Sequence, residues 1–343
     1  MITNALEMRH FYKALLFILV LTGMACSDEI VVYEDGLKTE LYVETNSVAL
    51  KSAISYEKSG VLKLQPAEMA MASDGTAKAG DYPLTLIATV NPPAFPGSDP
   101  LTATHAYLDG NYIYVSYNRA GEIYQGALDV VDISDPNVPR VRSRLFYSNA
   151  DINSIAYDNG NVYAVGGFDS EKSTRSDSNS FVAKIQVSGG IFNLGAGIEY
   201  GFQEGINPTD VKVSGNKVLV TSGGDGFLTA YDKNTLETLD DIPFADLRSV
   251  SVQDDKIAVL DASSGVKILN SDFGVTKEIN ISSDFGNFSK RTLDYTNDMI
   301  VVSEGSKGAG IYDANSGNLI EYLPILINPD GVALEDVVTV SYT

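Results

Sequence analysis

One hairpin pattern recurs along the chain every 40 to 55 residues or so, and it constrains the fold more than any other feature. Each copy pairs two apolar strands across a short turn of Gly, Asn or Asp, as in THAYLDGNYIYVSYN from residue 104 and SIAYDNGNVYAVGG from residue 154. Four further copies begin near residues 210, 249, 292 and 331. The last apolar residues before the turns are Leu108, Tyr157, Val213, Val252, Tyr295 and Leu334, at spacings of 49, 56, 39, 43 and 39. An all-strand repeat of this length is typical of a β-propeller.

The segments between the hairpins complete the blades. A third strand follows most hairpins, as in GALDVVDIS and FLTAYDKNT, and then a fourth, as in RVRSRLFYS and LIEYLPIL. We expect GVLKLQP from residue 60 and YPLTLIATVNPP from residue 82 to supply the outer strands of the sixth copy. The prediction is therefore an all-β propeller of six four-stranded blades, closed by strands from both chain ends. If residues 40–55 form a blade of their own, the count is seven.

The third and fourth strands of the first repeat carry a family resemblance. The segment GALDVVDISDPNVPRVRSRL from residue 126 resembles the LVIVD repeat of bacterial extracytoplasmic β-propeller lipoproteins, with matches at Gly126, Asp132, Ser134, Asp135, Pro136 and Pro139. The Asp and Ser side chains suit a turn and each Pro fixes φ, so these residues are interpreted as structural. The resemblance implies a fold and a location, and no reaction.

The N-terminus has the order of a secretory signal. Arg9 and Lys13 precede an apolar run at 14–21, and small residues lead to Cys26, the single cysteine of the chain. The ending TGMAC resembles a lipobox, which implies cleavage before Cys26 and acylation of that residue. The alternative is an ordinary buried thiol. Several acyl chains anchor a protein stably, whereas one chain binds a membrane only marginally.

The residues after Cys26 bear on location and domain organisation. Ser27, Asp28 and Glu29 resemble an acidic export tag, so we expect an outer-membrane protein at the cell surface; the alternatives are a simple solvated tether and a periplasmic face. The predicted organisation is a signal peptide at 1–25, a flexible tether at 26–45 and the propeller at 46–343, with closing strands within 46–91.

The net charge of the chain limits the classes of molecule that it can bind. Removal of residues 1–25 takes away Glu7, Arg9 and Lys13, which leaves 22 basic and 44 acidic residues and a net charge of −22. Such a chain repels nucleic acid. It is also repelled by anionic lipid, so we expect it to stand off the membrane on its lipid-bearing tether.

The repeat register predicts a polar ring at the channel mouth, the end at which the innermost strands start. The residues four and three positions before each aligned residue are Thr104-His105, Asn153-Ser154, Thr209-Asp210, Arg248-Ser249, Arg291-Thr292 and Asp330-Gly331. The ligand-binding candidates from this ring are His105, Asn153, Asp210, Arg248, Arg291 and Asp330, joined by the loop aromatics Tyr117, Phe168 and Phe227.

Two interpretations of these residues stay open. The ring can bind an anionic or hydroxyl-rich ligand by charge-assisted hydrogen bonds, with the aromatics stacking on sugars. Alternatively, Arg248 and Arg291 pair with Asp210 and Asp330 to hold the blades together, and the aromatics are loop packing.

Catalysis has little support in the sequence. His105 is the one histidine after residue 25, and no Gly-x-Ser-x-Gly motif accompanies it. One histidine and an acylated cysteine exclude a His/Cys zinc site. We expect no cofactor, with Ca²⁺ on the acidic rim as a weaker alternative.

Two functions therefore compete. The first is a non-catalytic lipid-anchored propeller that binds a glycan, a peptide or a membrane-protein partner. The second is a propeller enzyme, lactonase-like or polysaccharide lyase-like, that uses a channel-mouth metal or His105 with the arginines.

Overall fold

Antiparallel sheets of four or five strands account for most of the described chain. The computed structural model describes residues 41–57, 59–61, 63–65, 85–168, 178–204, 207–286, 290–323 and 325–327, all within one unit that spans residues 35–343. Cys26, Asp330 and the sixth hairpin lie outside the described residues.

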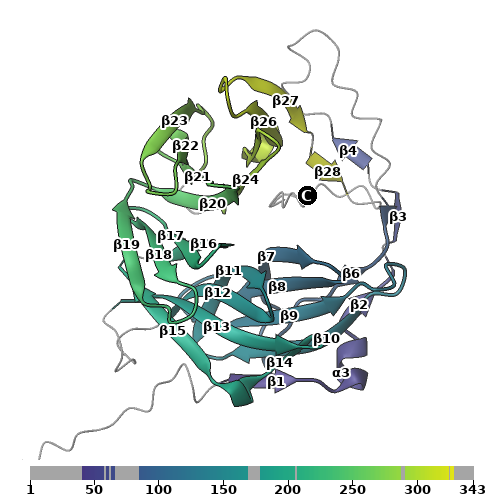
Figure 1. The fold of residues 1–343 in the computed structure, drawn as a ribbon. Helices are drawn as coiled ribbons and strands as arrows, with labels where there is room; N and C mark the ends of the chain where they lie inside the picture. Colours follow the sequence, from purple (N-terminus) through teal and green to yellow (C-terminus); the bar gives the residue numbers. More distant parts are fainter. Residues whose placement is uncertain are drawn as a thin grey trace, which may run out of the picture. The chain divides into compact units, whose positions relative to one another are not determined.

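The five predicted hairpins within the described residues each open a sheet, and sequence order sets the order of strands within the sheets (Figure 1). The first sheet contains β7 (Thr102–Asp109), β8 (Tyr112–Asn118), β9 (Gly126–Asp132) and β10 (Arg140–Tyr147). The second contains β11 (Ala150–Asp158), β12 (Asn161–Phe168), β13 (Ser180–Ser188), β14 (Ile191–Phe192) and β15 (Ile198–Gln203).

The other three sheets have four strands each. The third contains β16 (Pro208–Ser214), β17 (Lys217–Ser222), β18 (Phe227–Asp232) and β19 (Thr238–Pro243). The fourth contains β20 (Leu247–Gln253), β21 (Lys256–Asp261), β22 (Gly265–Leu269) and β23 (Val275–Asn280). The fifth contains β24 (Leu293–Thr296), β25 (Met299–Ser303), β26 (Ala309–Asp313) and β27 (Leu319–Leu323).

The first strand of each sheet contacts the first strand of the next, in the order β7, β11, β16, β20 and β24. This succession of antiparallel sheets, each with its first strand innermost, is a β-propeller, so the predicted fold class is confirmed at that level.

Two-residue turns explain why the hairpins were visible in the sequence. Asn159 and Gly160 close the second hairpin with φ of 46° and 81°, and Asn297 and Asp298 close the fifth with φ of 48° and 59°. Turns with positive φ at both central residues match the twist of paired strands, and Gly, Asn and Asp tolerate that geometry best.

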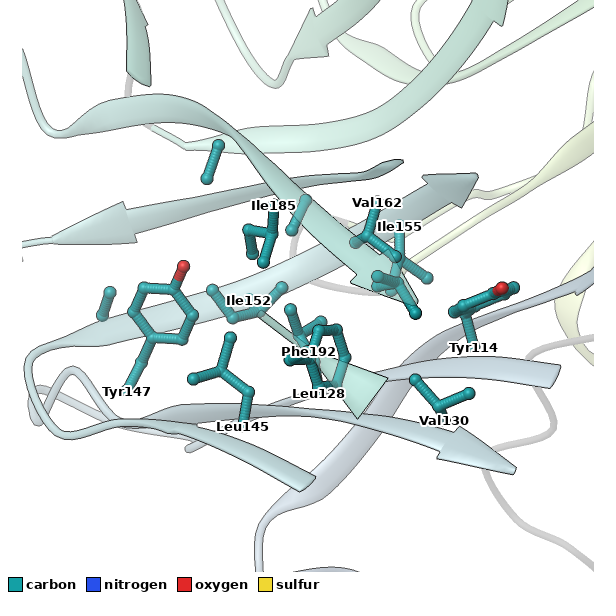
Figure 2. Close-up of a cluster of buried hydrophobic side chains, with 14 of the residues drawn as sticks. Tyr114, Leu128, Val130, Leu145, Tyr147, Ile152, Ile155, Val162, Ile185 and Phe192 are labelled. Atoms are coloured by element: carbon teal, nitrogen blue, oxygen red, sulfur yellow. The ribbon is translucent and has the colours of Figure 1, made fainter. Parts of the chain in front are cut away.

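Neighbouring sheets pack face to face through apolar side chains. Figure 2 shows the cluster between the first and second sheets, where Leu128, Val130 and Leu145 meet Ile152 and other buried residues of the second sheet. Each fully buried side chain of this kind contributes roughly 1.5–3 kcal/mol. With no second cysteine in the chain, this apolar packing carries the stability of the fold.

Short strands join the two ends of the described chain. β4 (Lys63–Gln65) pairs with β28 (Ile325–Ile327), and β3 (Gly60–Val61) pairs with β5 (Thr85–Leu86). β2 (Ile54–Ser55) pairs with β6 (Thr89–Val90). Segments from the N-terminal and the C-terminal parts of the described chain therefore pair with each other.

Two expectations for residues 40–55 need correction. β1 (Leu41–Glu44) pairs antiparallel with β10 as the fifth strand of the first sheet, so these residues belong to the folded domain and not to the tether. α3 (Ser47–Lys51) is a short helix, whose cap Asn46 accepts hydrogen bonds from Val48 N and Ala49 N. Residues 41–55 thus form no blade of their own, because the apolar residues of β1 complete the core beside the first sheet.

Candidate functional site at the channel mouth

A β-bulge interrupts four of the five inner strands at the same place. The strand pairing shifts across Thr104, Asn153, Thr209 and Arg248, which are the residues predicted four positions before each aligned residue. An extra residue in one strand loses its ladder partner and is re-aimed out of the regular pattern. The bulges therefore place these polar side chains at the start of the inner strands, where the repeat register predicted a ring.

Each bulged side chain donates a hydrogen bond to a backbone carbonyl of the next sheet along the chain. For Arg248 the carbonyl belongs to the loop that precedes that sheet. The four bonds run from Thr104 Oγ1 to Ile152 O (2.8 Å), Asn153 Nδ2 to Pro208 O (2.9 Å), Thr209 Oγ1 to Leu247 O (3.1 Å) and Arg248 Nη2 to Gly286 O (3.1 Å). The ring residues thus connect consecutive sheets, which fixes the geometry of the mouth.

Asp210 is the most heavily bonded carboxylate of the mouth. Its Oδ1 accepts from Ser154 Oγ (2.7 Å) and Val211 N (2.9 Å), and its Oδ2 accepts from Ser249 Oγ and Val250 N (3.2 Å). The donors come from three consecutive inner strands, β11, β16 and β20. Burial alone would raise the pKa of Asp210, but the charges of Lys212 and Lys290 and the hydrogen bond from Ser249 lower it below its ordinary value. Asp210 is therefore an ionised carboxylate with its acceptor capacity filled.

His105 is buried and neutral. Its Nδ1 lies 3.0 Å from Ile155 O, so the tautomer with a proton on Nδ1 donates to that carbonyl. Burial, and then the charge of Lys290, lower the pKa of His105 to about 3. The neutral form of His105 therefore predominates at neutral pH.

Lys290 crosses the mouth. It lies just before the fifth inner strand, and its Nζ donates to Asn153 O on the second. Burial lowers the pKa of Lys290 to about 8, although the charge of Asp210 opposes that change. The side chain of Asn153 makes two further hydrogen bonds to asparagines. Its Oδ1 accepts from Asn118 Nδ2 (3.0 Å), and its Nδ2 donates to Asn207 Oδ1 (2.7 Å).

A small polar cavity lies among these inner strands. Its volume is about 30 Å³, and its polar lining comes from His105, Asp210, Lys212, Ser249, Thr292 and Asp294. That volume holds one or two water molecules and no sugar ring. A ligand at this end therefore has to contact the outer surface of the mouth.

Arg248 does not make the pair with Asp210 that the alternative interpretation proposed, and Asp330, the other proposed partner, lies outside the described residues. Arg248 forms a two-pronged ion pair with Asp246, at 2.6 and 2.7 Å, and not with Asp210. Local geometry decides this, because Asp246 is two residues away and Asp210 is already saturated. Arg291 Nη1 donates to Lys290 O at 3.2 Å.

The predicted aromatics lie apart from this cavity. Tyr117 is buried and donates to Asp129 Oδ2 (3.0 Å), which Arg144 also binds. Phe168 is buried against Phe181 and Phe202. Phe227 is partly buried at the start of β18. The packing interpretation describes Tyr117 and Phe168, whose rings have no exposed face for a sugar.

The sequence did not indicate four polar residues of the mouth. These are Lys212, Lys290, and Asn118 and Asn207, which form hydrogen bonds with Asn153. Lys212 lies two residues after Asp210 and so points to the same side of β16. Lys290 precedes Arg291 by one residue and lies outside the two aligned columns. A third column on the same strand face would have found Lys212, whereas nothing local indicates that Lys290 reaches Asn153.

A second buried carboxylate holds the loop beside the mouth. Asp151 Oδ1 accepts from the backbone N–H groups of Arg119 (3.2 Å) and Gln125 (3.1 Å), at the two ends of the loop after β8. Burial raises the pKa of Asp151 to about 6, against the effect of these two hydrogen bonds.

Within the described ranges, no three His, Cys, Asp or Glu side chains come together as a metal site. The described helices are also too short or too polar to cross a membrane.

Comparison with known proteins gives fold likenesses alone. No protein-family model matches the chain, and no curated protein does. The computationally designed protein Ika8 is 16% identical to this chain, with a TM-score of 0.39. The match covers 66% of this chain and 62% of the length of Ika8. The WD40 β-propeller domain of Doa1 is 11% identical over 66% of this chain and 69% of its own, with a TM-score of 0.43. The designed protein Ika4 is 12% identical over 48% of this chain and 91% of its own, with a TM-score of 0.33. The propeller assignment rests on the sheet topology.

Proposed function

We propose that this chain is a non-catalytic, lipid-anchored β-propeller that binds a glycan or protein partner outside the cytoplasm. The observation that carries the proposal is the state of the channel mouth. Asp210 has four donors, His105 is neutral and bonded to the backbone, and the bulged residues connect the sheets. Groups committed in this way give a rigid polar surface, which supports a role in recognition.

The location follows from the N-terminus. Cys26 is the acylated residue, the acidic residues after it direct the protein to the cell surface, and the propeller belongs with the LVIVD-repeat lipoproteins. β1 begins at Leu41, so the proposed tether comprises residues 26–40. At up to about 3.3–3.6 Å per residue, this tether holds the domain as far as roughly 50 Å from its lipid.

The propeller has six blades. The sixth combines the hairpin from residue 331 with outer strands from the N-terminal segment. The pairing of β4 with β28 supports this closure, because it joins residues 63–65 to residues 325–327 directly before that hairpin.

Binding at the mouth is tested with glycan and peptide arrays probed by the purified protein. Lys290→Ala removes the side chain that crosses the mouth, and Lys256→Ala is the control, because Lys256 is half exposed and contacts surface Asp298 and the ring of Tyr295 instead of the mouth. A ligand bound by the wild type and by the control, but lost with Lys290→Ala, supports the proposal. Turnover of a bound compound that disappears with His105→Ala would establish the enzyme instead.

A further inference from the structure

The first sheet shows what fills an outer groove between two blades of this protein. β1 lies along the edge of β10, with Leu41 opposite Tyr147 and Val43 opposite Leu145. Leu41 and Val43 pack against the cluster between the first and second sheets. The filling is thus an extended segment with apolar side chains at alternate positions.

The third sheet repeats the geometry of the first. Leu128 lies opposite Leu145 in the first sheet, and Leu228 lies opposite Ile242 in the third. Gly126 lies opposite Tyr147, and Gly226 O accepts a hydrogen bond from Phe244 N (2.9 Å). Ile242 and Phe244 therefore occupy the positions of Leu145 and Tyr147. No described strand covers β19 as β1 covers β10.

At this place the third and fourth sheets leave an open groove of about 480 Å³. Its apolar walls are Ile242, Pro243 and Phe244 on one side and Phe273 and Val275 on the other. Phe244 and Phe273 are only partly buried, and Val275 is 51% exposed. Because the described segments leave this apolar groove uncovered, binding of an apolar segment there is favourable.

The charges at the groove specify the partner. In the first sheet Glu44 of β1 lies opposite Arg144, whereas Asp241 occupies the position of Arg144 in the third sheet. Asp241 lies beside the groove, and the groove's own lining contains the exposed carboxylate Glu278 together with Lys267, whose charge is paired with Asp261. The residue that takes the place of Glu44 is therefore basic, and the net charge of −21 attracts a basic segment.

Pro243 limits how the partner binds. It stands where Phe146 stands in the first sheet and has no N–H to give to an added strand. An edge with Pro and acidic residues resists unselective strand addition. Side chains seated in the groove, and not a full ladder, therefore carry the recognition.

We propose that the groove between β19 and the fourth sheet binds an extended peptide segment of a partner protein, with two apolar residues at alternate positions followed by Lys or Arg. This surface is separate from the channel mouth, so its test is independent of the one above.

The probe is a fluorescein-labelled Gly-Leu-Thr-Val-Lys-Gly peptide, titrated by anisotropy against the purified protein, with Gly-Leu-Thr-Val-Glu-Gly as its charge-reversed pair. We expect the basic peptide to bind more tightly than the acidic one, and Val275→Asp to weaken it about 10-fold, the effect of a little over 1 kcal/mol. Asp241→Lys reverses the preference between the peptides. Leu319→Asp is the matched control, because Leu319 is a 44% exposed apolar residue of the outer strand β27, and it leaves binding unchanged.

Equal binding of the two peptides, no binding of either, or full binding by Val275→Asp would overturn the proposal, provided that circular dichroism shows each variant folded. Loss of the peptide with Lys290→Ala and not with Val275→Asp would move the peptide to the channel mouth. The groove proposal then fails and the proposed function stands.

Discussion

Asp210→Asn tests whether a single buried carboxylate holds three inner strands together. The substitution keeps the shape of the side chain and one acceptor oxygen, so Ser154 Oγ and Val211 N can keep their bonds to Oδ1. An amide nitrogen then replaces Oδ2. Ser249 Oγ can rotate to accept from it, but Val250 N is left facing a second donor.

The contacts of Asp210 determine how much unfolding free energy the substitution should remove. The charges of Lys212 and Lys290 lower the pKa of Asp210, so the site favours the carboxylate over a neutral group, and hydrogen bonds to a charged group contribute about 1.5–3 kcal/mol. A buried N–H without an acceptor costs a further 1–3 kcal/mol or so. We therefore expect Asp210→Asn to lower the free energy of unfolding by about 3–5 kcal/mol at pH 7.

Urea unfolding followed by far-ultraviolet circular dichroism measures this loss, because the chain has no tryptophan to report by fluorescence. Asp294→Asn is the matched control. Among the described residues, Asp294 accepts hydrogen bonds from Ser251 Oγ (2.8 Å) and Tyr295 N (3.0 Å), both at Oδ1, so Asn can replace it at a cost below about 1 kcal/mol. If the two variants unfold at the same urea concentration, Asp210 does not join the strands in the way described.

Three further predictions concern the anchor, the closing strands and pH. Cys26→Ala should move the protein from the membrane to the soluble fraction with an unchanged melting temperature; retention in the membrane would contradict the lipid anchor. Deletion of residues 27–90 should lower the melting temperature strongly, because it removes β1 to β6, whereas deletion of residues 27–40 should not; equal melting of the two would refute closure from both ends. Asp151→Asn should stabilise the fold at pH 8 by about 3 kcal/mol, because a pKa raised to about 6 in the fold makes the ionised carboxyl fully unfavourable above pH 6. That gain should vanish near pH 4, where the wild-type group is protonated in the fold, and a gain independent of pH would show that Asp151 is not its source.

Local chemistry made much of the fold visible in the sequence. The turn residues Asn159-Gly160 and the alternating apolar residues beside them fix a hairpin within about 15 residues, so its existence and register follow from neighbours in the chain. The same periodicity placed Thr104, Asn153, Thr209 and Arg248 at one end of the inner strands, where the structure shows four bulges.

Tertiary packing decided what these residues contact. The strand β1 reads in isolation as part of a tether, and it becomes an edge strand because β10 offers an unpaired edge and an apolar cluster beside it. Lys290 forms a hydrogen bond with Asn153, which lies 137 residues away in the sequence. Arg248 pairs with Asp246 because hydroxyl and backbone N–H groups already fill the acceptor positions of Asp210. The sequence determined the strands and their polar ends because those depend on nearby residues. Which polar group meets which depends on how the sheets are brought together, and only the tertiary structure decides that.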